Sequence, residues 1–333
     1  MSTPASAWFK TEAPKSNALS DAHLREFAAQ VRADLSKPQK ELHSKYLYDE
    51  LGSALFEAIT RLPEYGLTRA DERLLCSHAR DIAQLIGAPE AVIELGSGTG
   101  EKTRHILEAF SAAGPKVRYI PIDVSPKALT RCQRDLADVA EVHALARSYL
   151  DGMASAVGRR CSTAPLLVLF LGSTIGNFER RCAVDFLHAL RRSLRPGDAL
   201  LLGADLVKDR DQMLRAYDDA IGLTAAFNLN LLGRINRELG GNFDLRNFQH
   251  EARWNEAGRR IEMHLRSRVN QTAFVIEGDF TVHFQAGETI WTESSHKFQI
   301  EELCEMAAQT GFRVEAQWVD REWPFVESLW IAR

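Results

Sequence analysis

Two polar side chains near the C-terminus share one face of an expected β-strand. The stretch GETIWTESSHKF, residues 287–298, alternates as a strand does and contains Thr, Ile, Trp and Phe, which favour strands. Glu293 and Ser295 are two residues apart, so a strand would direct a carboxylate and a hydroxyl to the same side. Taken alone, this pattern is more typical of an edge strand with a solvated face. The alternative is a pair of groups directed at a ligand, and the rest of the sequence decides between the two.

A second candidate site is the glycine-rich turn ELGSGTG, residues 94–100, between an expected strand and an expected helix. Open α/β sheets bind ligands at such turns, because glycines let a ligand approach the backbone and a helix N-terminus offers free N–H groups. Nucleotide sites and simple tight turns share this pattern. The dinucleotide fingerprint requires GxGxxG, whereas here an acid, Glu94, precedes GSGTG. This order resembles the S-adenosylmethionine (SAM) turn of Rossmann-like methyltransferases.

Two further polar groups follow expected strands. Asp123 lies at the end of the strand 117–124, where a carboxylate can accept hydrogen bonds from ribose hydroxyls. It could instead cap the next helix, but Ser125 already suits that position. The run LGSTIGN, residues 171–177, forms either a plain turn or part of a ligand crevice. Asn177 offers both donors and an acceptor, as recognition of an amino-acid head group requires.

The elements that must position these groups alternate between strand and helix from about residue 90. Apolar strands that alternate with helices indicate a parallel sheet covered on both faces. After Lys208 a helical stretch, broken near Gly222, and several antiparallel strands interrupt this rhythm. The expected strands are 91–98, 117–124, 141–148, 165–177, 198–207, 260–269, 272–278, 280–287, 288–295, 312–319 and 325–333. The expected helices are 101–114, 125–140, 180–194, 209–239 and 300–311.

Composition limits the classes of function. The 333 residues are 45% apolar and 26% charged, which is ordinary for a globular protein of about two domains. A net charge of −4 argues against a nucleic-acid surface. The five cysteines form no CxxC pair, so neither a zinc site nor a disulfide framework is indicated, and a reducing cytoplasm fits. Residues 1–16 lack the apolar core of a signal peptide, and the longest apolar run, 166–172, is too short to cross a membrane.

Long segments of the chain resemble one family, the SAM-dependent histidine Nα-methyltransferases of ergothioneine biosynthesis. The similar segments run in order from about residue 45 to 300: YLYDELGSALFEAIT, RLPEYGLTR, ELGSGTGEKTR, IPIDVS, LGSTIGN, GADLVKD, RAYDDAIGLTAAFNLNLL, INRELGGNFD, RIEMHL and GETIWTESSHKF. The resemblance implies an α/β, Rossmann-like class I methyltransferase sheet interrupted by a second, α+β domain, in agreement with the interrupted sheet inferred above. We expect residues 70–204 plus 297–333 to bind SAM and residues 11–69 plus 205–296 to bind the substrate.

The resemblance also implies roles for individual residues. The residues that correspond to SAM contacts are Gly96, Lys102, Asp123 at the ribose, and Ser148 and Tyr149 near the adenine. The residues that correspond to substrate contacts are Tyr65, Asn177 and Tyr217 at the α-carboxylate and amine, Glu293 and Ser295 at the imidazole, and Met263 nearby. Tyr48 matches a tyrosine beside the amine and is the candidate for a catalytic proton relay. Without the resemblance, Tyr48 and Tyr217 would be interpreted as packing aromatics and Met263 as a core residue.

The chain departs from the family's pattern at two places. Tyr65-Gly66 replaces a pair of tyrosines, which removes an aromatic ring from the pocket wall or from its support. Ser148 stands where relatives often carry an acid near the adenine, so a hydrogen bond to the adenine amine is expected to be weaker. Both departures bear on affinity and selectivity, and neither removes a group that the reaction needs.

The predicted function is SAM-dependent methylation of the α-amine of L-histidine, three times, to give hercynine for ergothioneine biosynthesis. Glu293 would accept a ring N–H and Ser295 would serve the second ring nitrogen, whereas an indole offers only one N–H to that pair. We expect a cytoplasmic monomer with SAM as co-substrate, no metal, and no nucleic-acid or membrane partner. The alternatives are an N-methyltransferase of the same fold acting on another amino acid or related amine, an NAD-dependent oxidoreductase, and a SAM-binding regulator without catalysis.

Overall fold

The computed structural model describes residues 18–112 and 114–333 of the chain. The chain forms two compact units: unit 1 comprises Met1–Ser53, Ala225–Glu251 and His264–Thr292, and unit 2 comprises Ala54–Thr224, Ala252–Met263 and Glu293–Arg333. Residues 1–16, which in sequence lack the apolar core of a signal peptide, and residues 11–17 of the expected substrate-binding domain lie outside the described residues. The expected assignment of SAM and substrate to separate domains stays a prediction, because compactness alone does not show what a unit binds.

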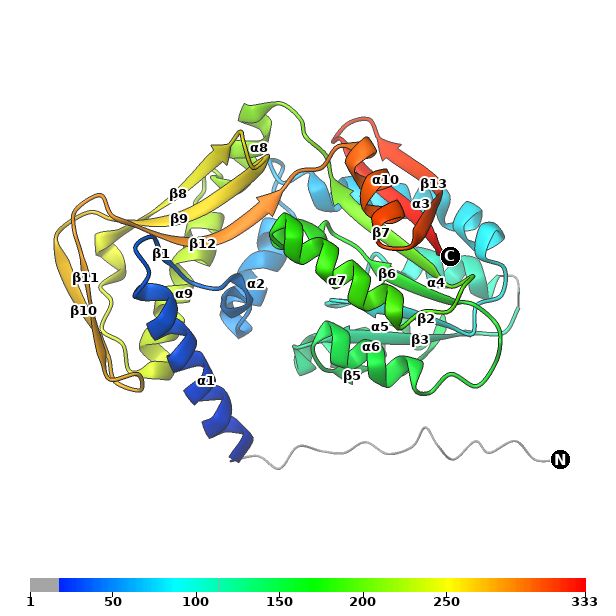
Figure 1. Ribbon diagram of the computed structural model, residues 1–333, viewed down its shortest axis with the longest axis horizontal. Coiled ribbons are helices and arrows are strands. Elements are labelled where there is room, and N and C mark those ends of the chain that lie inside the picture. The colour runs from blue at the N-terminus through cyan, green and yellow to red at the C-terminus, as the bar shows by residue number, and fades with distance from the viewer. Residues whose placement is uncertain (1–17, 113) are drawn as a thin grey trace. The chain divides into compact units, whose positions relative to one another are not determined.

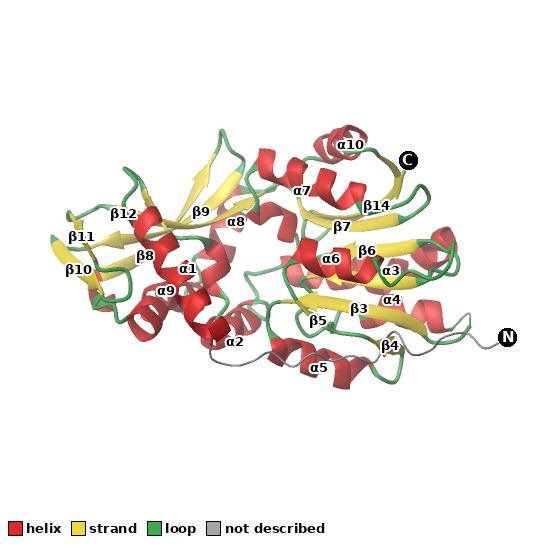
Figure 2. Cartoon of the chain, turned by 60° about the horizontal axis from the view of Figure 1, so that its bottom comes forward, coloured by secondary structure: helices red, strands yellow, loops and turns green. Residues whose placement is uncertain are grey.

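Unit 2 is built on an eight-stranded sheet with helices on both faces (Figures 1 and 2). Its strands are β2 (Ala91–Leu95), β3 (Val117–Asp123), β4 (Ala140–Val142), β5 (Leu145–Ala146), β6 (Leu166–Phe170), β7 (Ala199–Asp205), β13 (Phe312–Asp320) and β14 (Phe325–Ala332). They follow the order β13-β14-β7-β6-β2-β3-β4, and β5 pairs with β3. Neighbouring strands from β4 to β7 are parallel, whereas β14 runs antiparallel to both β7 and β13.

The helices of unit 2 bury opposite faces of this sheet. They are α3 (Leu67–Ile86), α4 (Arg104–Ser111), α5 (Pro126–Leu136), α6 (Tyr149–Val157), α7 (Arg180–Arg192), α8 (Arg210–Tyr217) and α10 (Ile300–Gln309). Successive residues of a strand point to opposite faces, and in β2 Val92 packs with α3, α4 and α5 whereas Ile93 packs with α6, α7 and α10. A strand covered on both faces must be apolar throughout, which explains why β2, β6 and β7 are continuous hydrophobic runs.

Unit 1 contains a smaller sheet and a hairpin. Its helical elements are α1 (Ala18–Leu35), η1 (Ser44–Leu47), most of α9 (Leu223–Leu239) and η3 (Leu245–Asn247). The sheet has the order β1-β12-β9-β8, and β10 pairs with β11. The strands are β1 (Lys40–Glu41), β8 (Phe248–Asn255), β9 (Arg260–Ser267), β10 (Gln271–Val275), β11 (Phe280–Phe284) and β12 (Thr289–His296). The unit boundaries fall within β8, β9 and β12, and also within α9 and α2 (Glu50–Ile59).

Most of the expected elements are confirmed, with three differences. The helical stretch 209–239 is broken near Gly222, as expected: α8 ends at Tyr217, and Gly222, with a φ of +80°, lets the chain turn directly before α9 begins at Leu223. The expected strand 141–148 is divided into β4 and β5, and the expected strand 165–177 ends at Phe170 and continues as the 3₁₀ helix η2 (Thr174–Asn177). The strands β1 and β8 were not expected.

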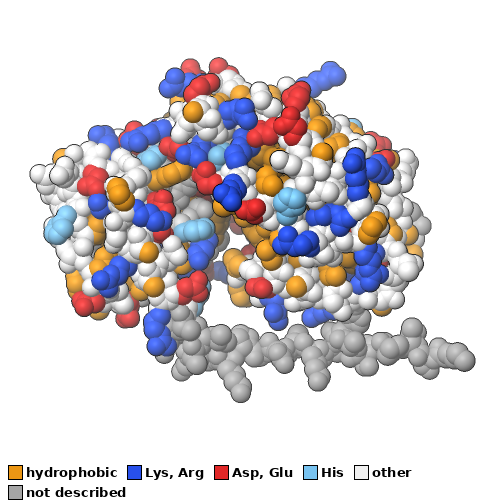
Figure 3. Space-filling model, viewed as in Figure 1, with side chains coloured by type: hydrophobic (Ala, Val, Ile, Leu, Met, Phe, Trp, Pro, Cys, Tyr) orange, Lys and Arg blue, Asp and Glu red, His pale blue; other side chains and the backbone are white. Residues whose placement is uncertain are grey.

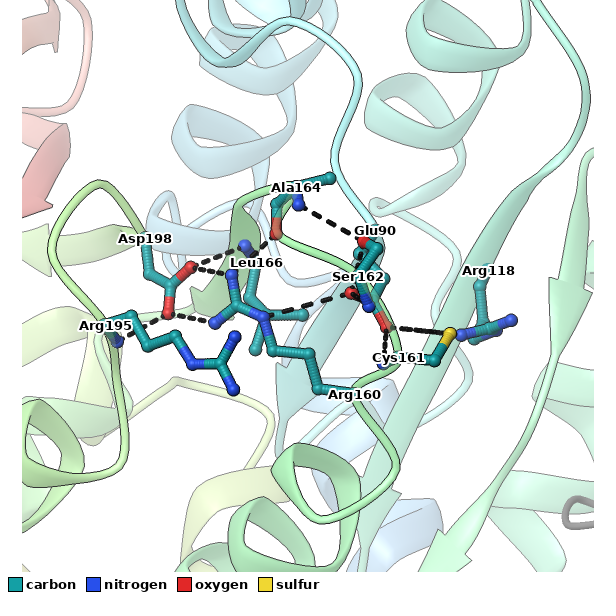
Figure 4. A network of polar contacts seen from close by, with 9 residues as sticks. All are labelled: Glu90, Arg118, Arg160, Cys161, Ser162, Ala164, Leu166, Arg195 and Asp198. Carbon is teal, nitrogen blue, oxygen red and sulfur yellow. Dashed lines mark hydrogen bonds and ion pairs between the residues drawn. The ribbon is translucent and has the colours of Figure 1, made fainter.

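A polar network closes the amino-terminal edge of the large sheet (Figure 4). Asp198, directly before β7, accepts two hydrogen bonds from the guanidinium of Arg160 at 2.8 and 3.0 Å, and others from the backbone N–H groups of Leu166 and Arg195 at 2.9 and 2.7 Å. Glu90, directly before β2, holds the loop ahead of β6 in the same manner. Asp198 thus satisfies a buried donor and Glu90 fastens an exposed loop where the strands begin, whereas open α/β sheets bind ligands at the opposite, carboxyl-terminal edge.

Candidate active site

The glycine turn lies at the carboxyl end of β2 and leads to α4. Gly96, Gly98 and Gly100 have φ values of +77°, +52° and +69°, which side-chain-bearing residues rarely adopt. A Cβ atom at Gly98 would meet nothing within 4 Å, and one at Gly96 would lie 3.1 Å from the hydroxyl oxygen of Tyr149. The backbone of this turn is therefore open to a close-lying ligand and faces an aromatic side chain, as a SAM site requires.

Asp123 lies beside this turn at the end of β3. One carboxylate oxygen accepts the Gly98 backbone N–H at 2.9 Å, and the other accepts the Ser125 backbone N–H at 2.8 Å. The Ser125 side chain caps α5 by accepting from the backbone N–H of Ala128 at 3.3 Å, as expected. Ser125, and not Asp123, is therefore the N-cap residue of α5. The half-buried carboxylate of Asp123 retains lone pairs that can accept further hydrogen bonds.

Ser148 and Tyr149 begin α6 at the same edge of the sheet. The ring of Tyr149 packs against Phe170 and Phe186, and burial raises the pKa of its phenol to about 12, so it remains a hydrogen-bond donor. The exposed Ser148 hydroxyl donates to the Asp151 carboxylate at 2.6 Å. An acid three residues further along therefore orients Ser148, and the oxygen of Ser148 keeps a lone pair that can accept from an amine.

Lys102 is held by a buried acid. Its ammonium donates to the carboxylate of Asp71, which also accepts the Gly172 backbone N–H at 3.1 Å. This carboxylate thereby links the turn after β2 to the turn after β6. Glu327 of β14 lies next to Asp71, and burial together with that neighbouring carboxylate raises the pKa of Glu327 well above its usual value. Lys102 thus balances the charge of Asp71, and the neighbouring Glu327 holds its proton.

Glu94 is not free to contact a ligand. Its buried carboxylate accepts hydrogen bonds from the Thr103 hydroxyl at 2.7 Å and from the Tyr119 hydroxyl. Burial raises the pKa of Glu94 to about 7, although both hydrogen bonds act in the opposite direction. The acid that precedes the glycines therefore fastens the turn to β3 and to the start of α4.

The polar row of β12 is buried, so the solvated-edge interpretation is wrong for these residues. Glu293 and Ser295 are 8% and 6% exposed and lie on one face of the strand. The Tyr217 hydroxyl, at the end of α8, lies 2.7 Å from Ser295 Oγ, and its ring packs edge-on to that of Tyr65 with centroids 6.0 Å apart. Burial raises the pKa of Glu293 to about 7, and the charge of Lys297 lowers it in part. Four of the expected substrate residues therefore meet in unit 2.

Lys297 belongs to this cluster and was not expected from the sequence. It is completely buried, its ammonium donates to Tyr217 at 2.8 Å and to Ser295 at 2.9 Å, and it forms an ion pair with the carboxylate of Asp205 at 2.8 Å. Lys208 pairs with the other oxygen of Asp205 at 2.6 Å. The signal for Lys297 was present, because it follows Ser295 by the same two-residue spacing that singled out Glu293 and Ser295.

The remaining expected substrate residues lie at different distances from this cluster. Asn177 ends η2, a turn that packs on the end of β12: a Cβ atom at the preceding Gly176 would lie 2.8 Å from the His296 carbonyl oxygen. Met263 is buried in β9, the strand paired with β12. Tyr48 lies in unit 1, where its ring packs edge-on to Phe227 at 5.5 Å.

Trp323 explains the glycine beside Tyr65. A Cβ atom at Gly66 would lie 2.2 Å from the ring of Trp323, so no larger side chain fits there without displacing that ring. The Trp323 indole N–H donates to Asp205 at 2.8 Å. The space beside Tyr65 is thus filled by an aromatic residue from the far end of the sequence, which is fixed by the same carboxylate that holds Lys297.

On the face shown in Figure 3, basic and acidic side chains are interspersed and form no single-sign patch. Within residues 18–112 and 114–333, no three His, Cys, Asp or Glu side chains are grouped as they would be around a metal ion. Within the same ranges, the helices are each too short or too polar to traverse a bilayer.

The strand order, the antiparallel β14 and the glycine turn after the central β2 together define a Rossmann-like class I methyltransferase fold. Over residues 27–332 the chain matches the family described as histidine-specific methyltransferase, SAM-dependent. The chain belongs to this family, and the resemblance, the fold class and the expected use of SAM are confirmed.

Curated relatives agree with this family. The chain is 44% identical over 304 residues to the histidine N-alpha-methyltransferase of Mycolicibacterium smegmatis. This alignment covers 90% of this chain and 92% of the relative. The chain is 43% identical over 305 residues, with the same coverage, to the enzyme of that name from Mycobacterium tuberculosis. It is 36% identical over 203 residues to ergothioneine biosynthesis protein 1 of Neurospora crassa, covering 60% of this chain and 23% of that protein.

Proposed function

We propose that this protein transfers methyl groups from SAM to the α-amino nitrogen of L-histidine, three times in succession, and thereby makes hercynine for ergothioneine biosynthesis. SAM-dependent methylation of histidine is the activity of the family to which the chain belongs. The proposal adds the number of methyl groups and the roles of individual residues. The observation that carries it is the buried row of β12, in which a carboxylate and a hydroxyl face the same side.

The proposed cofactor site is the carboxyl edge of β2 and β3. SAM supplies a methyl group already activated by a positive sulfur, so the protein's task is to hold and orient it. Gly96 leaves its backbone accessible, Asp123 accepts from the ribose hydroxyls, and Lys102 offers a cation to the carboxylate of SAM. The Ser148 oxygen accepts from the adenine amine, and the ring of Tyr149 packs against the base.

The proposed substrate site orients histidine by both of its ends. Glu293 accepts a ring N–H, and Ser295 bonds the second ring nitrogen. At the other end, Asn177 and the tyrosines Tyr65 and Tyr217 hold the α-carboxylate and amine. Met263 packs near the ring. A ligand held at two ends presents its amine in one orientation, and rates of transfer depend on such alignment at about 3–3.5 Å.

Each transfer is a single displacement. The lone pair of the neutral amine forms the new N–C bond while the C–S bond breaks and its electron pair goes to sulfur. The nitrogen must lose a proton before the second and the third attack, and the third attack leaves it quaternary. We assign the proton transfer to Tyr48 or to water held by it.

The test incubates the purified protein with SAM and each common amino acid and counts the added methyl groups by mass spectrometry. We expect histidine alone to be modified, with three methyl groups on the α-nitrogen located by fragmentation. Glu293→Ala should reduce kcat/KM for histidine on the order of 5- to 150-fold, the equivalent of about 1–3 kcal/mol for an unsatisfied buried partner. Histidine left unmodified, or methylated on its ring, would refute the proposal.

Other outcomes point to a different substrate. If Glu293→Ala scarcely changes turnover, the enzyme acts on another amino acid or related amine. The NAD-dependent and the non-catalytic alternatives lose their support, because the family is one of SAM-dependent methyltransferases.

We also propose that the enzyme is a cytoplasmic monomer. All five cysteines are free thiols, as expected in a reducing compartment. Light scattering during size-exclusion chromatography should give the mass of one chain, and a mass of two chains would contradict the monomer.

A further inference from the structure

Lys297 is a buried cation whose ammonium is held by two hydroxyls and a carboxylate. A lysine ammonium has three N–H groups and no acceptor, so it can only donate. In this protein it donates to the Tyr217 hydroxyl at 2.8 Å and to the Ser295 hydroxyl at 2.9 Å, and it forms an ion pair with the Asp205 carboxylate at 2.8 Å. The side chain of Lys297 is 0% exposed and cannot exchange these partners for water. Both hydroxyl oxygens must therefore each give one lone pair to Lys297.

These bonds determine which way the Ser295 hydroxyl can act. The oxygens of Tyr217 and Ser295 are 2.7 Å apart, so one hydroxyl donates to the other. A phenol is the more acidic hydroxyl and therefore the stronger donor, and burial raises the pKa of Tyr217, so that the phenol keeps its hydrogen. Ser295 Oγ then accepts from both Lys297 and Tyr217, its two lone pairs are used, and its own O–H can only donate.

The charges around the pocket act in the same direction. Lys297 and Lys208 both pair with Asp205, so an ammonium group lies directly behind the Ser295 hydroxyl. Glu293 is the remaining acid of the row, and Tyr65 and Tyr217 are neutral phenols. A ring nitrogen that carried a proton would face a hydroxyl unable to accept it and a buried ammonium behind that hydroxyl.

We propose that Lys297 is a positioning residue that makes Ser295 an obligate hydrogen-bond donor and so commits the site to neutral imidazole, with its N–H on Glu293 and its bare nitrogen on Ser295. This inference rests on histidine being the substrate. It also assigns the selectivity against indole and phenyl side chains to Lys297, because neither ring has a bare nitrogen to accept from Ser295.

The test reads the protonation of the bound ring directly. Histidine labelled with ¹⁵N in its ring is bound to the whole protein together with S-adenosylhomocysteine, and ¹⁵N NMR spectra are recorded between about pH 6 and 8, where free imidazole titrates. We expect one protonated and one bare ring nitrogen throughout. A ring protonated on both nitrogens in the wild-type protein, or one that exchanges between tautomers, would overturn the proposal.

Two variants separate the hydrogen bonds from the charge. Lys297→Met removes the donors to both hydroxyls, so Ser295 can accept and the bound ring should carry two protons near neutral pH. Lys208→Met is the matched control: it removes an ammonium from the same Asp205 and touches neither hydroxyl, and the ring should stay neutral. A neutral ring in Lys297→Met, or an equal change in both variants, would contradict the assignment.

Folding and function are controlled separately. If Lys297→Met fails to fold because Asp205 loses a partner, Lys297→Met with Asp205→Asn removes both charges and takes the same measurement. If wild-type protein neither binds nor methylates histidine, the proposed function fails. If it methylates histidine while the bound ring is doubly protonated, only the role of Lys297 fails.

Discussion

Asp205 binds two buried ammonium groups and an indole N–H with one carboxylate. Burial alone would raise the pKa of Asp205, but Lys208 and Lys297 outweigh it and lower the pKa below its usual value. The carboxylate is therefore ionised throughout the range in which the enzyme would work. Removing one partner of such a buried group typically lowers the free energy of unfolding by about 3–5 kcal/mol. The cluster therefore holds Lys297, and through it the hydroxyls of Tyr217 and Ser295, in fixed positions.

Tyr48 is the residue whose assigned role most needs a kinetic test. Tyr48→Phe keeps the ring that packs on Phe227 and removes the hydroxyl. If this hydroxyl relays the amine proton, kcat should fall on the order of 100-fold with little change in the KM for histidine, as for other acid–base groups. Steady-state kinetics measure both constants. Tyr46→Phe, in the 3₁₀ helix that directly precedes Tyr48, is the control and should leave kcat unchanged.

An unchanged kcat in Tyr48→Phe would restrict Tyr48 to packing and would leave proton transfer to water. A lower kcat together with a raised KM would instead indicate a disturbed fold. A thermal melt of Tyr48→Phe, compared with that of Tyr46→Phe, would detect such a disturbance.

At the level of single residues, the sequence predicts groups whose spacing is regular and misses groups whose burial is unexpected. Glu293 and Ser295 were placed on one face by their two-residue spacing, and their role at the ring came from the family resemblance. Lys297 continues that period, but lysine is seldom fully buried, so its type alone suggests a solvated position. The role of Trp323 beside Gly66 is a contact between distant parts of the chain, which one sequence without its fold does not contain.

Among the elements, the two edges of the large sheet have different tasks. The loops at the amino-terminal edge are held by Asp198 and Glu90, whereas the turns after β2, β3 and β6 carry Gly96, Asp123 and Asn177. A parallel sheet brings all its carboxyl ends to one edge, so groups far apart in sequence meet there. This is why the glycine turn after β2 could be predicted as a candidate site from its motif and from its place between an expected strand and an expected helix.

The N-terminus of α3 depends on the absence of a side chain at Gly66. The φ of Gly66 is −72°, which any residue can adopt, so the steric contact with Trp323 is the constraint. Gly66→Ala should lower the free energy of unfolding by about 1–3 kcal/mol, the usual cost of overpacking. Chemical denaturation measures this change.

A compensating substitution tests the reason. Trp323→Leu in the Gly66→Ala background removes the clash and should restore part of the lost stability relative to Gly66→Ala alone. A Gly66→Ala protein as stable as wild type would show that the ring of Trp323 moves aside without cost.

The elements that were missed or misjudged are those that depend on a neighbour. β8 has the sequence FQHEARWN, in which charged and polar residues alternate with few apolar ones, and β9 supplies its hydrogen bonds. β1 has two residues and exists only by pairing with β12. β4 and β5 are short parallel partners of β3. A long apolar strand can be recognised from its own sequence, whereas these short or polar strands form because a neighbouring strand pairs with them.

At the scale of the whole molecule, buried acids of the site should reduce stability as pH rises. The pKa of Glu293 is raised from its usual 4.5 to about 7, so its stabilising contribution is present below pH 4.5 and is lost as pH rises through about 7. The difference corresponds to roughly 3 kcal/mol. Glu293→Gln lacks this group, so its free energy of unfolding relative to wild type should increase by about that amount between pH 5 and 8.

Urea denaturation at a series of pH values measures this prediction. The opposite dependence is expected for His296, because burial lowers its pKa from 6.5 to about 4 and its contribution is lost as pH falls through that range. A difference between Glu293→Gln and wild type that does not change with pH would mean that Glu293 ionises as easily in the folded protein as in the unfolded chain.

The interrupted sheet was predicted for the whole chain because strands and helices alternate on either side of the antiparallel segment. The placement of β13 and β14 in the same sheet as β2–β7 confirms it. The sequence pattern does not give the boundaries of the two compact units, because they fall inside continuous strands and helices where the sequence carries no linker.

Trp323 filling the space beside Gly66 restricts how this gene can recombine with those of its relatives. A relative with a second tyrosine after Tyr65 would need a smaller residue opposite it. A crossover anywhere between the two codons would then join two bulky rings, or leave a hole where both were absent. Hybrids of these enzymes should therefore remain functional only when both positions come from the same parent.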